Sequence, residues 1–478
     1  MATVGIGWTI GGVVFAIAAG AAAAFAPWWA IGLGVLVAAV GMLIGLRRSL
    51  PALTRMERHP LALELVALPL VVSIRHSTIL TLVLLGLLLL ISLARRQRVD
   101  DAPINYVPVL LLLLAAGLIF RNGPYTIAAL FVLVVLVLAA ASVSVSRTTA
   151  YASLTAGLSL YLVANIAGWI VGIQSVSASV RVGGYESSGG FFGARVFFPF
   201  ARSINEPSFI AAALILAVVA MLSVRTAPRW YHWVGVAAGL FVIAASNSRT
   251  PLLMLIPAAL FILIAPRITR RGAPFVAGGV MLLPFLLPAL RPSVNWVAEK
   301  IAGNDYLARG QSVHDIGGLG TRDIIWEQSI GFWDRQVDSL LHQVAGFGYN
   351  GHAVSGASDY YATGIGDFLS RRSALTMHNS FLQTLFDGGL IGAFCVLGVT
   401  VFLVWRYAQR PELLPVFAIA LMLGLSAGTE VSLAPGLSQT PVFLLLFLAV
   451  FVPRKHRQEQ DGQPAASSRP PRQGVKTA

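Results

Sequence analysis

The sequence predicts an all-α fold: a polytopic transmembrane helix bundle with about 12–14 spans and a large external loop containing short helices. Two observations carry this prediction. Of the 478 residues, 56% are hydrophobic and 11% are charged, and the mean hydropathy is +0.77. A globular domain has about a quarter of charged residues. A water-soluble fold of this length could not bury so much apolar side chain, so we expect lipid to be its solvent.

The second observation is a series of apolar runs. A transmembrane helix needs about 20 apolar residues, and somewhat fewer where neighbouring helices shelter it. The runs at 61–74, 251–265 and 440–452 are the shortest, so the expected number of spans is about fourteen with them and about twelve if some of them do not cross. Candidate spans lie near residues 4–25, 28–46, 61–74, 77–93, 104–120, 124–145, 149–171, 205–224, 231–246, 251–265, 274–290, 379–404, 411–427 and 440–452.

The orientation follows from the basic residues. Most of the 34 lysines and arginines fall in short connections that share one side if the N-terminus is cytoplasmic. Cytoplasmic connections are enriched in Lys and Arg, so both termini are expected in the cytoplasm. This bias also accounts for the net charge of +14, which in a soluble protein would suggest binding to nucleic acid. We therefore expect the lipid bilayer as a partner and no nucleic acid.

Two classes of architecture are excluded by simple counts. The single cysteine, Cys395, excludes intrachain disulfides and cysteine metal clusters. No internal repeat supports the paired-half architecture of many transporters.

The apolar runs and the loops between them divide the chain into five parts. The expected parts are N-terminal transmembrane helices (1–150), central transmembrane helices with a first external loop near 172–204 (151–290), a large external loop (291–378), C-terminal transmembrane helices (379–452) and a disordered cytoplasmic tail (453–478).

Two arginines stand at the external ends of apolar spans. Arg202 precedes one span in F-F-P-F-A-R-S-I-N-E-P-S-F, and Arg249 closes another in S-N-S-R-T-P. A guanidinium at a membrane surface suits a phosphate, because it offers a planar fork of donors and stays charged. The alternative is that these side chains extend to lipid headgroups. Arg195 is a second candidate for the arginine of the first external loop.

The large loop contains a stretch, G-L-G-T-R-D-I-I-W-E-Q-S-I-G-F-W, that predicts a short amphipathic helix. Thr321 is its expected N-cap. Trp326, Ile330 and Trp333 recur at helical spacing and give one apolar face. Arg322 lies on the same side, where it either faces a binding surface or stacks on Trp326.

Further along, the sequence T-M-H-N-S-F-L-Q opens a span with His378 and Asn379. Histidine is the side chain best suited to proton exchange near neutral pH. The alternative is that Asn379 caps the helix and His378 is an interfacial residue. The loop shows no ligand spacing typical of a metal site and no Walker motif, so no metal and no cofactor are expected.

Taken in order, these motifs resemble the O-antigen ligase and polymerase superfamily, the Wzy/WaaL-like membrane glycosyltransferases. The resemblance covers roughly residues 150–405 and includes an external Arg before a span, S-x-S-R, then R-x-x-x-W and G-x-G in the loop, and H-N-x-x-L-Q leading into D-G-G-L-I-G. The E-P-S stretch at Glu206 is more similar to polysaccharide polymerases than to ligases.

The resemblance implies a metal-independent, inverting glycosyltransferase in the bacterial plasma membrane, acting on the extracytoplasmic face. Its donor would be a polyprenyl-pyrophosphate-linked oligosaccharide, its acceptor a glycan hydroxyl, and its further partner a flippase or a chain-length regulator. His378 would be the general base, with Glu206 as the alternative base. Arg322 and Arg249 would stabilise the departing pyrophosphate, while Arg202, Arg195, Trp326 and Asn379 would bind substrate.

Two other classes of function compete with this interpretation. A transporter or a flippase for lipid-linked oligosaccharides would have a similar number of spans. Such a protein should carry charges inside its spans, whereas these spans are nearly free of charge apart from Glu64. A structural or signalling membrane protein would need no partnership between His378 and Arg322.

Overall fold

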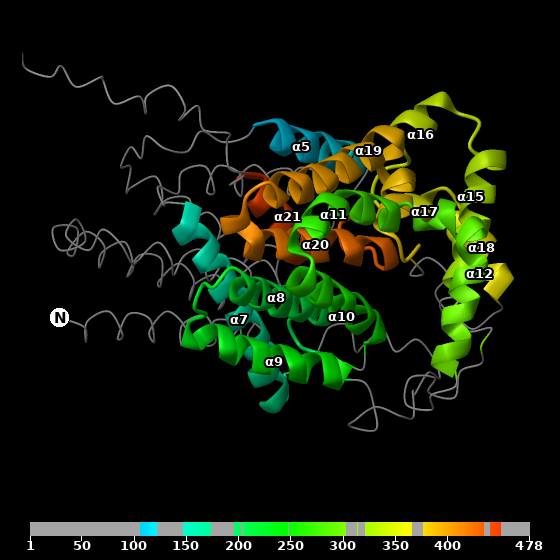
Figure 1. The fold of residues 1–478 in the computed structure, drawn as a ribbon. Coiled ribbons are helices and arrows are strands. Elements are labelled where there is room, and N and C mark those ends of the chain that lie inside the picture. The colour runs from blue at the N-terminus through cyan, green and yellow to red at the C-terminus, as the bar shows by residue number, and fades with distance from the viewer. Residues whose placement is uncertain are drawn as a thin grey trace, which may run out of the picture.

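The computed structural model describes residues 106–121, 147–173, 196–201, 203, 205–246, 248–302, 313, 321–365, 376–434 and 440–450 (Figure 1). These residues form helices and connections, without a β-strand among them. The spans expected before residue 94 and near 124–145 lie outside the described residues. So do Arg195, Arg202 and the tail from 453.

Six helices lie side by side as a bundle (Figure 1). The central helix is apolar on all sides and buried on nearly all of them, as expected for a helix surrounded by other helices. It packs against four of the other five bundle helices. The six are α8 (Glu206–Ser223), α9 (Trp230–Ser246), α10 (Arg249–Ile264), α11 (Pro266–Met281), α19 (Ser380–Ala408) and the central α20 (Leu414–Thr429).

Three further helices pack against this bundle. α5 (Tyr106–Phe120) lies against α19, α7 (Arg147–Ile170) lies against α9 and α8, and α21 (Thr440–Val450) contacts α5. Each coincides with an expected span to within a few residues. The sequence therefore located these three apolar helices correctly.

The lengths of the helices agree with a helical membrane protein. Three segments, Glu206–Ser223, Ser380–Ala408 and Pro411–Thr429, are long and apolar enough to cross a membrane. The bent pair formed by α11 and α12 would count as a fourth. Several shorter apolar helices lie beside them in the bundle.

The span expected at 274–290 is wrong in its bounds. The chain forms α11, ending at Met281, and then α12 (Leu283–Ala302), which is turned by 100°. Pro284 lacks the N–H that would bond to the Val280 carbonyl, and the N–H of Phe285 donates to the Leu282 carbonyl at 3.0 Å. The Met281 carbonyl therefore accepts from Asn379 Nδ2 at 3.0 Å instead. The apolar run of 274–290 is therefore divided between two helices, because a proline and a tertiary contact end α11.

Short helices beyond α12 form a cap over one end of the bundle (Figure 1). The expected loop helix is present as α15 (Arg322–Gln336), and Trp326, Ile330 and Trp333 pack on the core. Thr321 occupies the N-cap position but makes no side-chain capping bond, since its backbone is left-handed with φ 72°. The remaining cap helices are α16 (Leu340–Ala345), α17 (Gly351–Val354) and α18 (Ala357–Ile365).

The cap is locked to the bundle at a break in α19. Gly389 has φ 66° and ψ −168°, so the helix is interrupted there. The carbonyls of Phe386 and Asp387 accept hydrogen bonds from the N–H groups of Phe347 and Gly348, each at 2.8 Å. A Cβ atom on Gly389 would lie 2.3 Å from the Val344 carbonyl oxygen. The G-F-G and D-G-G motifs therefore form one interlocked contact.

Candidate functional site

Hydrogen bonds tie several helix ends together beneath the cap, at what we term the loop end of the bundle. The side chain of Asn379, the N-cap of α19, donates to the carbonyls of Met281 (3.0 Å) and Gly428 (2.9 Å). Asn205, which precedes α8, donates to Glu430 at 2.7 Å and accepts from Ser248 at 2.9 Å. The loop end thus comprises the starts of α8, α10 and α19 and the ends of α11 and α20.

A carboxylate lies at the centre of this end. Glu430 is the first residue after α20, and its side chain is 13% exposed. One carboxylate oxygen, Oε1, accepts from Arg322 Nη2 and from Asn205 Nδ2, both at 2.7 Å. Arg322 reaches it from the first residue of α15. The ion pair therefore joins the cap to the bundle.

The surroundings of Glu430 fix its charge. Burial raises the pKa of this carboxyl, but the Arg322 guanidinium, His378 and the Asn205 amide outweigh burial and hold the pKa below its ordinary value of 4.5. Glu430 is consequently ionised at neutral pH. An ionised carboxylate with a lowered pKa is a poor base but a good anchor for cationic groups.

His378 faces the other oxygen of the same carboxylate. Its Nδ1 atom lies 3.6 Å from Glu430 Oε2, a distance for an ionic contact rather than a hydrogen bond. Catalytic hydrogen bonds are often long before substrate binds. The ring is about one-third exposed, and the backbone has φ 49°. Because Nδ1 faces Glu430, Nε2 is the nitrogen available to a substrate.

The segment before His378 is held from two sides. The indole of Trp326 donates to the carbonyl of Met377 at 2.8 Å, and the N–H of Met377 donates to Gln383 Oε1 at 3.4 Å. Gln383 in turn donates to Asp387 Oδ1 at 3.0 Å. The expected R-x-x-x-W motif thus performs two tasks, since its Arg contacts Glu430 and its Trp positions the chain beside His378.

Trp326 and Asn379 have structural contacts. Trp326 is 1% exposed and Asn379 is fully buried. Asn379 Oδ1 accepts from the N–H of Leu382 at 2.8 Å, which makes Asn379 the cap that the sequence suggested as an alternative. Both side chains position the loop end from beneath, and their expected role in binding substrate has no support from this burial.

The other expected residues lie nearby or outside the described chain. Glu206 follows Asn205 and is 7% exposed, and its N–H donates to Ser203 Oγ at 3.1 Å. The backbone of Arg249 begins α10 next to Ser248, so it belongs to the loop end. Its side chain lies outside the described part, as do Arg195 and Arg202.

Sequence reasoning missed the central residue, Glu430. A carboxylate that directly follows an apolar run, as Glu430 follows 414–429, is as unusual at a span end as an arginine, and this signal could have identified it. Asn205 and Ser248 were also missed. They lie next to Glu206 and Arg249, which the sequence predicts as candidates.

The donor set at the loop end favours ion pairing and proton transfer. The described residues contain no group of three or more His, Cys, Asp or Glu side chains that could hold a metal ion. Arg322 has further N–H donors beyond the one bound to Glu430, so it can bind an anion as well.

No family model, curated protein or solved structure matches the chain.

Proposed function

We propose that the protein is a metal-independent, inverting glycosyltransferase of the O-antigen ligase and polymerase type. It takes a glycan from a polyprenyl-pyrophosphate donor and joins it to an acceptor hydroxyl at the outer face of a bacterial plasma membrane. The observation that carries the proposal is that Arg322 and His378 both contact Glu430 at one end of an apolar bundle. Arg322 is an anion-binding group and His378 is a proton acceptor.

In this reaction the acceptor oxygen attacks the anomeric carbon of the donor sugar. A new C–O bond forms as the bond between that carbon and the pyrophosphate oxygen breaks on the opposite side, which inverts the anomeric centre. His378 accepts the proton of the hydroxyl, a task that contributes about 10²–10⁴ in rate. The polyprenyl pyrophosphate leaves with the electron pair of the broken bond.

Arg322 stabilises the charge that develops on the leaving pyrophosphate. Loss of one preorganised contact of this kind costs about 3–4 kcal/mol in the barrier. Arg249 lies at the same end by its backbone, and Arg202 and Arg195 remain predicted partners of the donor. Glu430 aligns Arg322 and balances the charge on His378 once it is protonated.

The distribution of charge supports the outer face as the location of the site. The helix ends opposite the loop end are rich in arginine, as cytoplasmic ends are. With about 12–14 spans, both termini lie in the cytoplasm and the lipid tail of the donor lies along the bundle. A glycan acceptor and a flippase or chain-length regulator complete the expected partners.

The experiment uses purified protein with a polyprenyl-pyrophosphate oligosaccharide and a glycan acceptor, and measures new glycosidic bonds. Ladders of product indicate a polymerase, and a single addition indicates a ligase. Arg322→Gln should abolish transfer, whereas Arg335→Gln, on the exposed end of the same helix, should not. His378→Asn should also abolish transfer, because Asn tolerates the left-handed backbone but accepts no proton.

Three outcomes would overturn the proposal. Wild-type rates in both Arg322→Gln and His378→Asn would place the chemistry elsewhere. Loss of turnover in EDTA, restored by Mg²⁺ or Mn²⁺, would overturn a metal-independent reaction. Movement of the lipid-linked donor across a sealed vesicle without a new glycosidic bond would show the flippase instead.

A further inference from the structure

The end of the bundle opposite the loop end is dominated by arginine. We term it the arginine-rich end. In the described chain, Glu412 is the one acidic residue at these helix ends. The arginines there whose side chains the structure describes are Arg225, Arg229, Arg267, Arg270, Arg271, Arg406 and Arg410.

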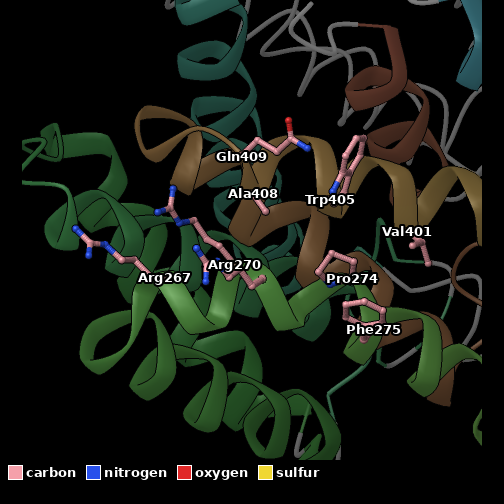
Figure 2. A pocket seen from close by; sticks show the side chains of 9 residues that line it. Arg267, Arg270, Pro274, Phe275, Val401, Trp405, Ala408 and Gln409 are labelled. Carbon is pink, nitrogen blue, oxygen red and sulfur yellow. The ribbon is translucent and has the colours of Figure 1, made fainter. Parts of the chain in front are cut away.

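A hollow of about 720 Å³ lies at this end, between the start of α11 and the end of α19 (Figure 2). Arg267, Arg270 and Arg271 line it on one side. Pro274 and Phe275 line it deeper along α11 and lie away from the arginine heads in Figure 2. The hollow is therefore basic at its rim and apolar along its length.

The second helix adds apolar surface and an aromatic ring. Val401 and Trp405 of α19 face the hollow, and Trp405 is 48% exposed. Tryptophan is enriched where a membrane meets water, since its ring is apolar and its N–H is polar. Phe275 is 81% exposed, so this apolar wall is covered by nothing in the described chain.

The basic rim has unused capacity for an anion. Arg270 Nε is buried and has no hydrogen-bond partner among the described residues. Arg267 lies in the first turn of α11, where the helix dipole disfavours cations and favours anions, and Arg270 and Arg271 follow in the second turn. The lining carries no acidic side chain that would neutralise them. An anion in the hollow would satisfy both the arginines and the helix end.

We propose that this hollow is a binding site for an anionic phospholipid. The phosphodiester binds the guanidinium groups of Arg267, Arg270 and Arg271, and an acyl chain lies along Pro274, Phe275 and Val401. A phosphate alone would leave the apolar wall exposed, and a zwitterionic lipid such as phosphatidylcholine would bring a second cation next to the three arginines. The inference does not depend on the proposed glycosyl transfer, because the site lies at the other end of the bundle.

The experiment measures lipid retention on the full chain by native mass spectrometry. Detergent-purified protein is titrated with phosphatidylglycerol, with phosphatidylcholine, and with phosphatidylglycerol in the presence of inorganic phosphate. The test variant is Arg267→Gln/Arg270→Gln. The matched control is Arg225→Gln/Arg229→Gln, which removes two exposed charges from the same end without touching the hollow.

Wild type should retain phosphatidylglycerol in preference to phosphatidylcholine. Each arginine near a lipid phosphate contributes about fivefold in affinity, so the test variant should lose about 30-fold and the control variant much less. Arg267→Lys/Arg270→Lys should restore most of the binding if the fold is intact. Equal loss in the control variant, equal retention of phosphatidylcholine, or displacement by millimolar inorganic phosphate would overturn the site.

Discussion

Replacing Glu430 by Gln tests the centre of the loop end most directly, because the change keeps the shape of the side chain and removes its charge. Arg322 and Glu430 have side-chain exposures of 18% and 13%. Removing one member of a fully buried ion pair costs about 3–5 kcal/mol, since the other charge is left without a partner. The remaining exposure reduces this, and we expect Glu430→Gln to lower the free energy of unfolding by about 2–3 kcal/mol.

The assay is thermal unfolding of the detergent-purified chain, as a double-mutant cycle with Arg322→Gln. Each single change should lower the midpoint by roughly 2–3 °C, because the entropy of unfolding of a chain of this length is about 1 kcal/mol/K. The double variant should lose little more than either single one, because neither charge is then left alone, which gives a coupling of about 2 kcal/mol. The control is Arg291→Gln, whose ion pair with Asp323 is half exposed at the arginine and should contribute about 0–1 kcal/mol.

Additive losses would refute this reasoning. If Glu430→Gln and Arg322→Gln together cost the sum of the single changes, the two side chains are not coupled in the folded protein. The same conclusion would follow if Arg291→Gln destabilised the chain as much as Arg322→Gln.

Three further predictions concern the same region. Because the pKa of Glu430 is lowered on folding, its stabilisation is complete well above pH 4.5 and is lost as pH falls below that value, so thermal melts of Glu430→Gln should depend less on pH in this acid range than those of wild type. Gly389→Ala should lower the free energy of unfolding by about 2–3 kcal/mol or more, seen as a lower unfolding temperature, because φ is 66° and the Val344 oxygen lies 2.3 Å from the added carbon. Gly398→Ala, with open space around the added carbon, should leave the unfolding temperature unchanged. Gln383→Leu should lower the rate of glycan transfer by about tenfold while leaving donor affinity unchanged, since it removes the acceptor of the Met377 N–H and frees the segment before His378.

The sequence predicted much of the fold because apolar runs and helices coincide in this chain. α8, α9, α19 and α20 begin and end within a few residues of the expected spans. The failure at α11 and α12 has a physical cause. Composition shows where a segment is apolar, but it does not show where a proline and a side chain from another helix end it.

The site was predicted in part, and its missing residue explains the limits of motif reasoning. Arg322 and His378 were identified as separate motifs, 56 residues apart in the sequence. Nothing in either motif indicates that both contact Glu430, which lies 52 residues beyond His378. Such a contact depends on the bends of the chain between the motifs, and those bends are set by tertiary packing.

The contacts of α15 show why the loop and the bundle function as one site. The helix presents Arg322 to Glu430 and, one turn later, Trp326 to the carbonyl of Met377. Both partners belong to bundle segments, one after α20 and one before α19. A shift of α15 by one residue would move Arg322 about 100° around the helix axis and would break both contacts together. The charge at Arg322 and the position of His378 are therefore set by the same docking of one helix, and no change can loosen α15 without disturbing both.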